Sequence, residues 1–381
     1  GGGASTEHAA TGEPSPVAAV ASLSLFPEAS EAAKAYFDAY NAAGGLDGRP
    51  IELTVFDDKA DPATSVTVAN DVVTSDAVAL VGSASLLACA VNAATWEENG
   101  IVSFMGAATD PFCFDVPSIA PANSGAFLGT VASLTYGSEE LGFENVCAVI
   151  VKDDALSEKI FNDLFAAWEQ ATGSKLAYLD NSLTRGQASY ASNISQLKQQ
   201  DCDALFVNEV ADAVLGLLGE ATNQGVSLPV LALTSVYSDQ FAAAAASYGG
   251  EIYAPAEFVP YSSDDAANAD WAAVMEQAGV TKTAFAQGGY AMAEAFVRVL
   301  ESIEGDITRD SFTAEARSMS EPLAAPMLGG SWIFGPGEAH HPNQNVWPVV
   351  LEPGTSTWKS LGVKMTADEI GWVPLELPKP E

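Results

Sequence analysis

Few residues in this chain have the type and spacing that catalysis requires. His340 and His341 are neighbours, so on a strand they would point to opposite faces and could not share a metal ion; we expect them in a surface loop. The turn Gly82-Ser83-Ala84-Ser85 is similar to a nucleophile turn but lacks its closing glycine. The 381-residue sequence also has no Walker loop, dinucleotide fingerprint or zinc-protease motif. We therefore predict no enzyme activity, no cofactor and no metal site.

Two short segments instead have the composition of a small-molecule site. Residues 83–85 precede a predicted helix at 86–99, and residues 107–109 follow a predicted strand at 100–104. Open α/β sheets bind ligands at the carboxyl ends of their strands, and the N–H groups at a helix N-terminus attract anions. We expect a ligand carboxylate at these loops. The alternative for Thr109 is a hydroxyl that only stabilises a turn.

The elements that position these loops alternate between strands and helices. Short apolar runs at residues 78–81, 146–151 and 204–207 predict buried strands, and stretches with helical spacing separate them. A proline-rich passage at 112–121 interrupts the alternation, which restarts at Phe127. Such alternation predicts parallel sheets with helices on both faces, so the sequence indicates two α/β lobes.

The four cysteines predict two disulfides in an exported chain. Cys147 and Cys202 each come at the start of an apolar run, and if those strands are parallel neighbours the two residues lie side by side. Cys89 and Cys113 then pair by elimination. Free buried thiols are the alternative.

The most specific pattern lies between Tyr36 and Asp61. An apolar helical stripe ends at Asn41-Ala42-Ala43-Gly44-Gly45, a turn at Gly48-Arg49-Pro50 leads into an alternating strand, and Asp57-Asp58 precedes Asp61-Pro62, which opens the next helix. In this order the pieces resemble the extracytoplasmic solute-binding proteins of branched-chain amino acid (leucine/isoleucine/valine) ABC importers. The resemblance covers essentially the whole chain after its N-terminal segment.

The resemblance implies the periplasmic binding protein type I fold, with two doubly wound lobes joined by three crossovers. The expected parts are a disordered tether at residues 1–16, an N-terminal lobe at 17–121 and 257–335, and a C-terminal lobe at 122–256 and 336–381. It also implies capture of a small organic acid or amino acid in an interlobe cleft and delivery to permease subunits. The alternatives are a ligand-sensing module of a receptor and a binder of a neutral or aromatic solute.

In the resembled family these two loops hold the ligand's carboxylate and amino group, but several family residues are replaced here. The site hydroxyl falls on Ala88, an aromatic falls on Leu156, and the acid that pairs the ligand's ammonium falls on or beside Thr234. Glu209 is a substitute ammonium partner, or else a solvated acid. The candidate ligand-binding residues are Ser83, Ser85, Leu86, Leu87, Ala88, Ala107, Ala108, Thr109, Leu156, Glu209, Val210, Thr234, Tyr237 and Gln287.

Charge limits the partners of this chain. Fifty acidic and 15 basic residues give a formal net charge of −35, which repels nucleic acid and anionic lipid surfaces. No apolar run has the length of a membrane span. The polar residues 1–16 are typical of the tether that follows a removed signal peptide, so we expect a bacterial cell-surface or periplasmic protein, with a lipid anchor as a hypothesis.

Overall fold

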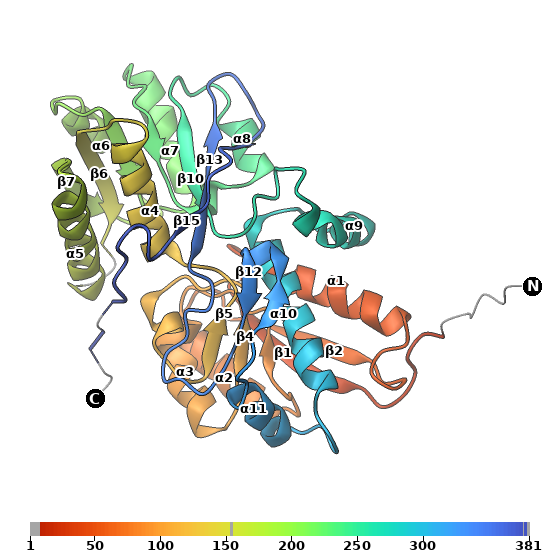
Figure 1. Cartoon of the computed structure of the whole chain (residues 1–381). Coiled ribbons are helices and arrows are strands. Elements are labelled where there is room, and N and C mark those ends of the chain that lie inside the picture. Colours follow the sequence, from red (N-terminus) through yellow and green to blue (C-terminus); the bar gives the residue numbers. More distant parts are fainter. Residues whose placement is uncertain (1–7, 153–154, 376, 379–381) are drawn as a thin grey trace, which may run out of the picture. The chain divides into compact units, whose positions relative to one another are not determined.

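The computed structural model describes residues 8–152, 155–375 and 377–378 (Figure 1). The chain forms two compact units: unit 1 is Gly1–Gly125, Asp265–Asn343 and Leu377–Glu381, and unit 2 is Ala126–Asp264 and Gln344–Glu376. Both combine a largely parallel sheet with helices, which confirms the α/β fold class.

Unit 1 contains a five-stranded parallel sheet in the order β2-β1-β3-β4-β5. Its interior is apolar, and three of its strands, β3, β4 and β5, have only two or three residues each. The strands are β1 (Ser15–Ala21), β2 (Ile51–Asp57), β3 (Leu80–Val81), β4 (Ser103–Met105) and β5 (Ile119–Pro121).

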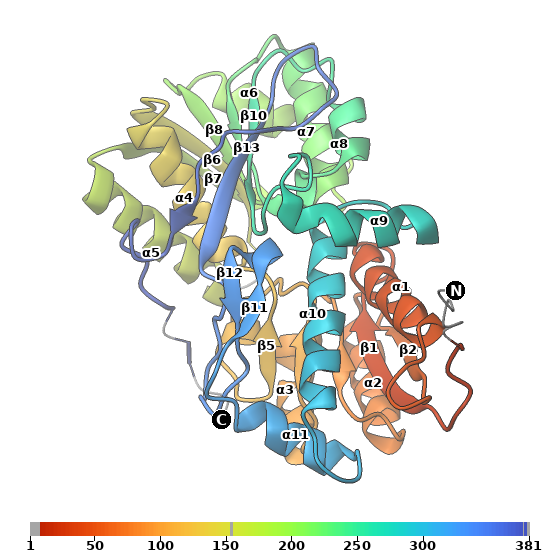
Figure 2. The same ribbon diagram turned by 45° about the vertical axis from the view of Figure 1, so that its right-hand side comes forward.

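The helices of unit 1 come from both ends of its sequence, and α10 packs along α1 (Figure 2). A Cβ added at Gly289 of α10 would collide with the backbone of Ala29 in α1, so only glycine allows this approach. The helices are α1 (Glu28–Ala42), α2 (Pro62–Thr74), α3 (Ala88–Glu98), α9 (Ala269–Ala278), α10 (Ala284–Glu301) and α11 (Arg309–Arg317), with 3-10 turns η1 (Pro111–Phe114), η3 (Ala266–Asn268) and η4 (Pro326–Leu328) and the hairpin β11 (Leu323–Ala325) and β12 (Gly330–Trp332).

The turns of the Tyr36–Asp61 segment form as predicted. Helix α1 ends at Ala42, and Gly44 and Gly45 follow with φ of 114° and 61°, values that favour glycine. Asp61 caps α2, because its Oδ2 accepts the Thr64 N–H at 2.8 Å, and Pro62 occupies the first turn.

Unit 2 contains a larger sheet in the order β14-β13-β10-β9-β8-β6-β7, with β15 also paired to β13. Strand β13 runs antiparallel to β10 and departs from an all-parallel sheet. The strands are β6 (Asn145–Val151), β7 (Lys175–Leu183), β8 (Ala204–Val207), β9 (Val230–Leu231), β10 (Ile252–Ala256), β13 (Asn345–Leu351), β14 (Lys359–Ser360) and β15 (Met365–Thr366).

The helices of unit 2 supply aromatic side chains to its core. Trp168 and Phe165 of α5 are buried, and the Phe165 ring meets Phe206 of β8 edge-on at 5.8 Å. The helices are α4 (Ala126–Glu139), α5 (Ala155–Thr172), α6 (Ala191–Leu197), α7 (Ala211–Asn223) and α8 (Asp239–Ala244), with the 3-10 turn η2 (Thr234–Val236).

Both predicted disulfides are present: Cys89 bonds to Cys113 in unit 1, and Cys147 to Cys202 in unit 2. The second follows from the sheet, because β6 pairs with β8 in parallel.

Part of the expected tether is ordered. The Ala10 N–H donates to Asn41 O and the Gly12 N–H to Gly48 O, both at 2.8 Å, and β1 begins at Ser15. Residues 1–7 of that tether lie outside the described residues. Across the part of the chain that is described, no helix is both long enough and apolar enough to span a membrane.

Candidate functional site

The carboxyl ends of β1, β3 and β4 meet at one edge of unit 1, because these strands are parallel neighbours. Bridges join Ala84 to Ala21 on one side and to Ala107 on the other. The turn after β3 begins at Gly82, whose φ of 77° favours glycine. The two predicted loops, 83–85 and 107–109, are therefore adjacent.

The buried carboxylate of Asp58 organises this edge. Its Oδ1 accepts the Ser22 hydroxyl at 2.7 Å and the Ala60 N–H at 2.9 Å, and its Oδ2 accepts the Ser85 hydroxyl. A carboxylate only accepts, so both serines must donate their hydroxyl hydrogens to it. Neither hydroxyl hydrogen remains for a ligand. Lys59 and Ala60, with φ of 55° and 53°, turn the chain tightly after this carboxylate.

The oxygen atoms of the same serines accept the backbone N–H groups that lead into α3. Ser85 Oγ accepts from Leu87 and Ala88, each at 3.0 Å, and Ser22 Oγ accepts from Leu86 at 3.2 Å. The predicted anion site used these N–H groups. They are satisfied within the protein, so that part of the prediction is wrong for this structure.

Ser83 is also an internal residue. It is buried, and its Oγ accepts the Val20 N–H at 3.0 Å, which ties the turn to β1. Ser83 was a candidate because residues 83–85 lead into a predicted helix N-terminus, but its hydroxyl is buried against β1 and does not face a ligand.

Thr109 is the best-placed donor on the unit 1 edge. It is half-buried, and its hydroxyl donates to Ser85 O at 2.8 Å. Ala108 is held by Asn123, which accepts the Ala108 N–H at 2.8 Å and donates to Ala108 O at 3.0 Å. By contrast, no group among the described residues accepts a hydrogen bond from the Thr109 N–H. Thr109 therefore combines a turn-stabilising hydroxyl with an unused backbone donor.

Apolar side chains lie beside these loops. Half-buried Leu86 and Phe285 pack against a buried cluster that includes Phe26, and the ring centroids of Phe26 and Phe285 are 5.1 Å apart. Gln287, in the first turn of α10, is fully buried, and its Nε2 donates to Asn268 Oδ1 at 2.9 Å. Leu86 is positioned to contact an apolar ligand, whereas Gln287 belongs to the interior of unit 1.

In unit 2, Glu209 follows β8 and forms an ion pair rather than standing in solvent. Its side chain is 2% exposed, and its Oε1 accepts Arg185 Nη1 at 3.1 Å and the Val210 N–H at 2.9 Å. Arg185 follows β7, and β6 lies between β7 and β8, so the pair reaches across the end of β6. The solvated-acid alternative is wrong.

The remaining candidates in unit 2 have structural partners. The Thr234 hydroxyl donates to Pro255 O. Tyr237 is 2% exposed, its hydroxyl lies 2.6 Å from Ser262 Oγ, and burial raises its pKa to about 12. Tyr237 was a candidate ligand-binding residue, but its ring packs in the core. Leu156 and Val210 are half-buried at the starts of α5 and α7.

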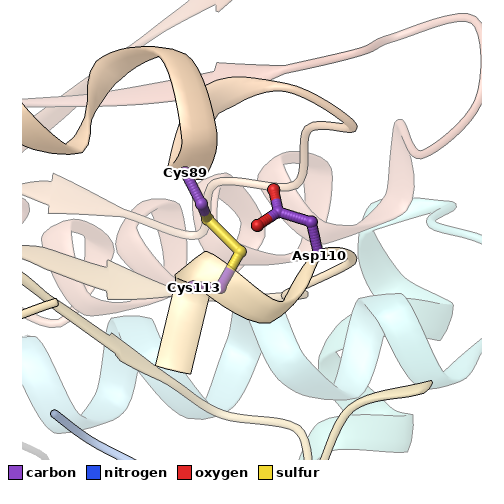
Figure 3. A group of neighbouring side chains, drawn as sticks. All are labelled: Cys89, Asp110 and Cys113. Atoms are coloured by element: carbon purple, nitrogen blue, oxygen red, sulfur yellow. A yellow bond between two sulfur atoms is a disulfide. The ribbon is translucent and has the colours of Figure 1, made fainter. Parts of the chain in front are cut away.

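The carboxylate of Asp110 lies beside the Cys89–Cys113 disulfide (Figure 3). The ligand atoms of these three residues lie within 4.8 Å of one another, but sulfurs joined in a disulfide are not the thiolates that metals prefer. Asp110 Oδ1 accepts the Phe112 N–H at 2.8 Å, whereas Oδ2 is buried without a partner. Burial raises the pKa of Asp110 to about 7. This group is a titrating acid rather than a metal ligand.

The two adjacent histidines are not in a surface loop. His340 is 5% exposed and its Nε2 lies 3.1 Å from Pro117 O, while His341 Nε2 lies 2.7 Å from Ser124 O. Since carbonyl oxygens only accept, both rings donate. Burial lowers the pKa of each ring, so both histidines are structural and neutral.

The profile of the family described as "Periplasmic binding protein" matches residues 15–356. The chain belongs to this family. Its members are extracytoplasmic, and the resemblance noted in the sequence is thereby confirmed. A curated relative in this comparison, an amino acid binding protein of Pseudomonas aeruginosa, is 25% identical over 246 residues, which cover 62% of this chain and 63% of the relative.

Solved periplasmic binding proteins share the fold. The isoleucine complex of LivJ from Streptococcus pneumoniae aligns with a TM-score of 0.76 and 17% identity, over 93% of this chain and 100% of LivJ. A fatty acid ABC transporter substrate-binding protein from Thermomonospora curvata aligns with a TM-score of 0.78 and 16% identity, over 97% of both chains. A solute-binding protein from R. palustris in complex with 4-hydroxybenzoate aligns with a TM-score of 0.77 and 16% identity, over 93% of this chain and 97% of that protein. At these identities the likeness establishes the fold alone.

Proposed function

We propose that this member of the periplasmic binding protein family is the solute-binding component of an ABC importer. It captures a small carboxylic acid at its strand-end loops and catalyses no reaction. The observation that carries this proposal is Thr109, whose N–H has no acceptor among the described residues at the carboxyl edge of the unit 1 sheet. A ligand carboxylate supplies the missing acceptor.

Two contacts favour an acid without an amino group. Glu209, the expected ammonium partner, already accepts the guanidinium of Arg185 at 3.1 Å. The family's acid falls on or beside Thr234, whose hydroxyl donates to Pro255 O. A ligand ammonium would have to displace Arg185, so amino acids bind less well than simple acids. Half-buried Leu86, Leu156 and Val210 then contact the apolar body of the ligand.

The experiment is a thermal-shift screen of aliphatic acids, aromatic acids and amino acids of matched size. A ligand at 100 times its Kd adds about 2.7 kcal/mol to stability. We expect stabilisation by at least one simple acid and less by its α-amino derivative. Recovery of the bound acid unchanged supports a binding protein, whereas turnover contradicts it.

The Glu209→Gln variant separates the two ligand classes. If Glu209 pairs with a ligand ammonium, the variant loses amino acid binding and keeps simple acids. On our proposal, any change in affinity is shared by an acid and its α-amino derivative, because Glu209 contacts Arg185 rather than the ligand.

The location and the partner belong to the same proposal. Two disulfides fit an oxidising compartment outside the cytoplasm. We propose that the protein delivers its solute to a membrane permease and carries an N-terminal lipid anchor. Delivery to a permease is tested by reconstituted uptake that depends on the protein. The lipid anchor is tested by intact-mass analysis of the native protein.

A further inference from the structure

Unit 1 contains a cavity that is separate from the strand-end loops. It lies between α9, α10 and the hairpin of β11 and β12, three elements that Figure 2 shows side by side, and it offers about 160 Å³. Its apolar walls include Trp271, Tyr290, Trp332 and Met327, all buried. None of the candidate solute-binding residues lines it.

The cavity also carries acidic groups. Tyr290, Glu294 and Arg298 are spaced by four residues on one face of α10, and Asp270 of α9 lies at the same cavity. Arg298 contacts the β11–β12 hairpin, where its Nη1 donates to Ala324 O at 2.7 Å. Within the part of the chain that is described, neither Glu294 nor Asp270 forms an ion pair.

The electrostatics of the cavity agree with this geometry. Burial raises the pKa of Glu294, Arg298 opposes the increase, and the Asp270 carboxylate adds to it. Burial also raises the pKa of Tyr290 to about 12, with further increases from Glu294 and Asp270. Both shifts therefore arise mainly from burial, and the neighbouring charges contribute less.

We propose that this cavity is a second small-molecule site, which binds an organic cation of the alkylammonium class. Aromatic faces attract such cations through their quadrupoles, and the two carboxylates supply the opposite charge. An anion would meet Asp270 and Glu294. A hard divalent ion requires six or more oxygen ligands, whereas most of the residues that line this cavity have apolar or aromatic side chains.

The test uses choline and its uncharged isostere 3,3-dimethylbutan-1-ol, titrated calorimetrically into the full chain. We expect saturable 1:1 binding of choline and about tenfold or weaker binding of the isostere, a difference of roughly 1.4 kcal/mol. Equal binding of the two would show an apolar cavity without cation recognition and would overturn the proposal. Absence of saturable choline binding would also overturn it.

Two variants locate the site. Glu294→Gln keeps the shape of the side chain and removes its charge, so choline should bind about tenfold more weakly. Glu304→Gln is the matched control, because Glu304 is an exposed acid that does not line the cavity. With a net charge of −35, diffuse attraction of any cation is the main competing explanation. If Glu304→Gln weakens choline as much as Glu294→Gln does, the cavity is not the site. Circular dichroism of both variants confirms that they are folded.

Discussion

Asp58 and Ser85 are joined by a hydrogen bond that fixes the direction of the serine hydroxyl. Because the carboxylate can only accept, Ser85 donates its hydrogen to Asp58 and turns its lone pairs toward the N–H groups of Leu87 and Ala88. The turn after β3 is thus held by the buried Asp58 carboxylate, which lies 27 residues earlier in the chain than Ser85.

Replacing Asp58 by asparagine should destabilise the protein. The amide oxygen can accept from Ser22 or Ser85, but the amide nitrogen donates, so one serine hydroxyl loses its acceptor. A buried unsatisfied polar group costs about 1–3 kcal/mol, and urea unfolding measures the loss. Asp57→Asn is the control, because half-buried Asp57 accepts only the Leu23 and Lys59 N–H groups in the described structure. Equal losses in both variants would argue against the Asp58 network.

Thr109→Ala should weaken the binding of a carboxylic acid about two- to tenfold. The variant keeps the N–H that we assign to the ligand but removes the neutral hydrogen bond from the Thr109 hydroxyl to Ser85 O, which positions that N–H and contributes roughly 0.5–1.5 kcal/mol. Thr109→Ser keeps the hydroxyl and should retain most of the affinity. Calorimetry with the acid found in the thermal-shift screen decides it. Unchanged affinity in Thr109→Ala would mean that the ligand does not contact this loop.

Gly289→Ala should destabilise unit 1, because a Cβ at this position collides with the backbone of Ala29 and forces α1 and α10 apart. Overpacking of this kind costs about 1–3 kcal/mol. Gly219 of α7 provides the opposite case: nothing lies within 4 Å of its Cβ position, and Gly219→Ala should stabilise the protein by about 0.5–1 kcal/mol through helix propensity. Thermal unfolding of the two variants should therefore shift in opposite directions. A matching shift in both would contradict the packing argument.

The sequence predicted the features that depend on local pattern or on neighbouring strands. Helical and strand periodicities gave α1, α2 and β6, and the Cys147–Cys202 pairing followed once β6 and β8 were taken as neighbours. Strand β10 was missed because it contains Pro255. Antiparallel β13 sits outside the strand-helix alternation, so its direction had no local signal.

The candidate site was harder to predict, because its contacts depend on sheet order. Residue type correctly indicated polar groups after strands, but it could not show that Ser85 is committed to Asp58 or that Tyr237 is buried. Arg185 and Glu209 meet only because β7 and β8 flank β6. The Asp57-Asp58 pair was visible in the sequence and was the one available signal for the buried carboxylate.

The buried carboxyl of Asp110 should make stability depend on pH. Burial raises its pKa from an ordinary value near 4 to about 7 in the folded protein. The folded state therefore holds its proton over a range in which the unfolded state has lost it. A proton held more tightly by the folded state means that the free energy of unfolding falls as pH rises from about 4 to about 7 and is level above that range.

Asp110→Asn should abolish this fall, because asparagine does not titrate and its side-chain oxygen can still accept the Phe112 N–H. The parent should lose on the order of a few kcal/mol between pH 4 and pH 7 through this group, since each pKa unit corresponds to about 1.4 kcal/mol. The measurement is urea unfolding at several pH values in this range, with the disulfides intact. Exposed Asp76 supplies the control Asp76→Asn, which should follow the parent's curve. The difference in unfolding free energy between Asp110→Asn and the parent should grow with pH and then become constant above about pH 7. A difference that stays constant from pH 4 upward would show that Asp110 is already ionised throughout and that its buried Oδ2 is stabilised without a proton.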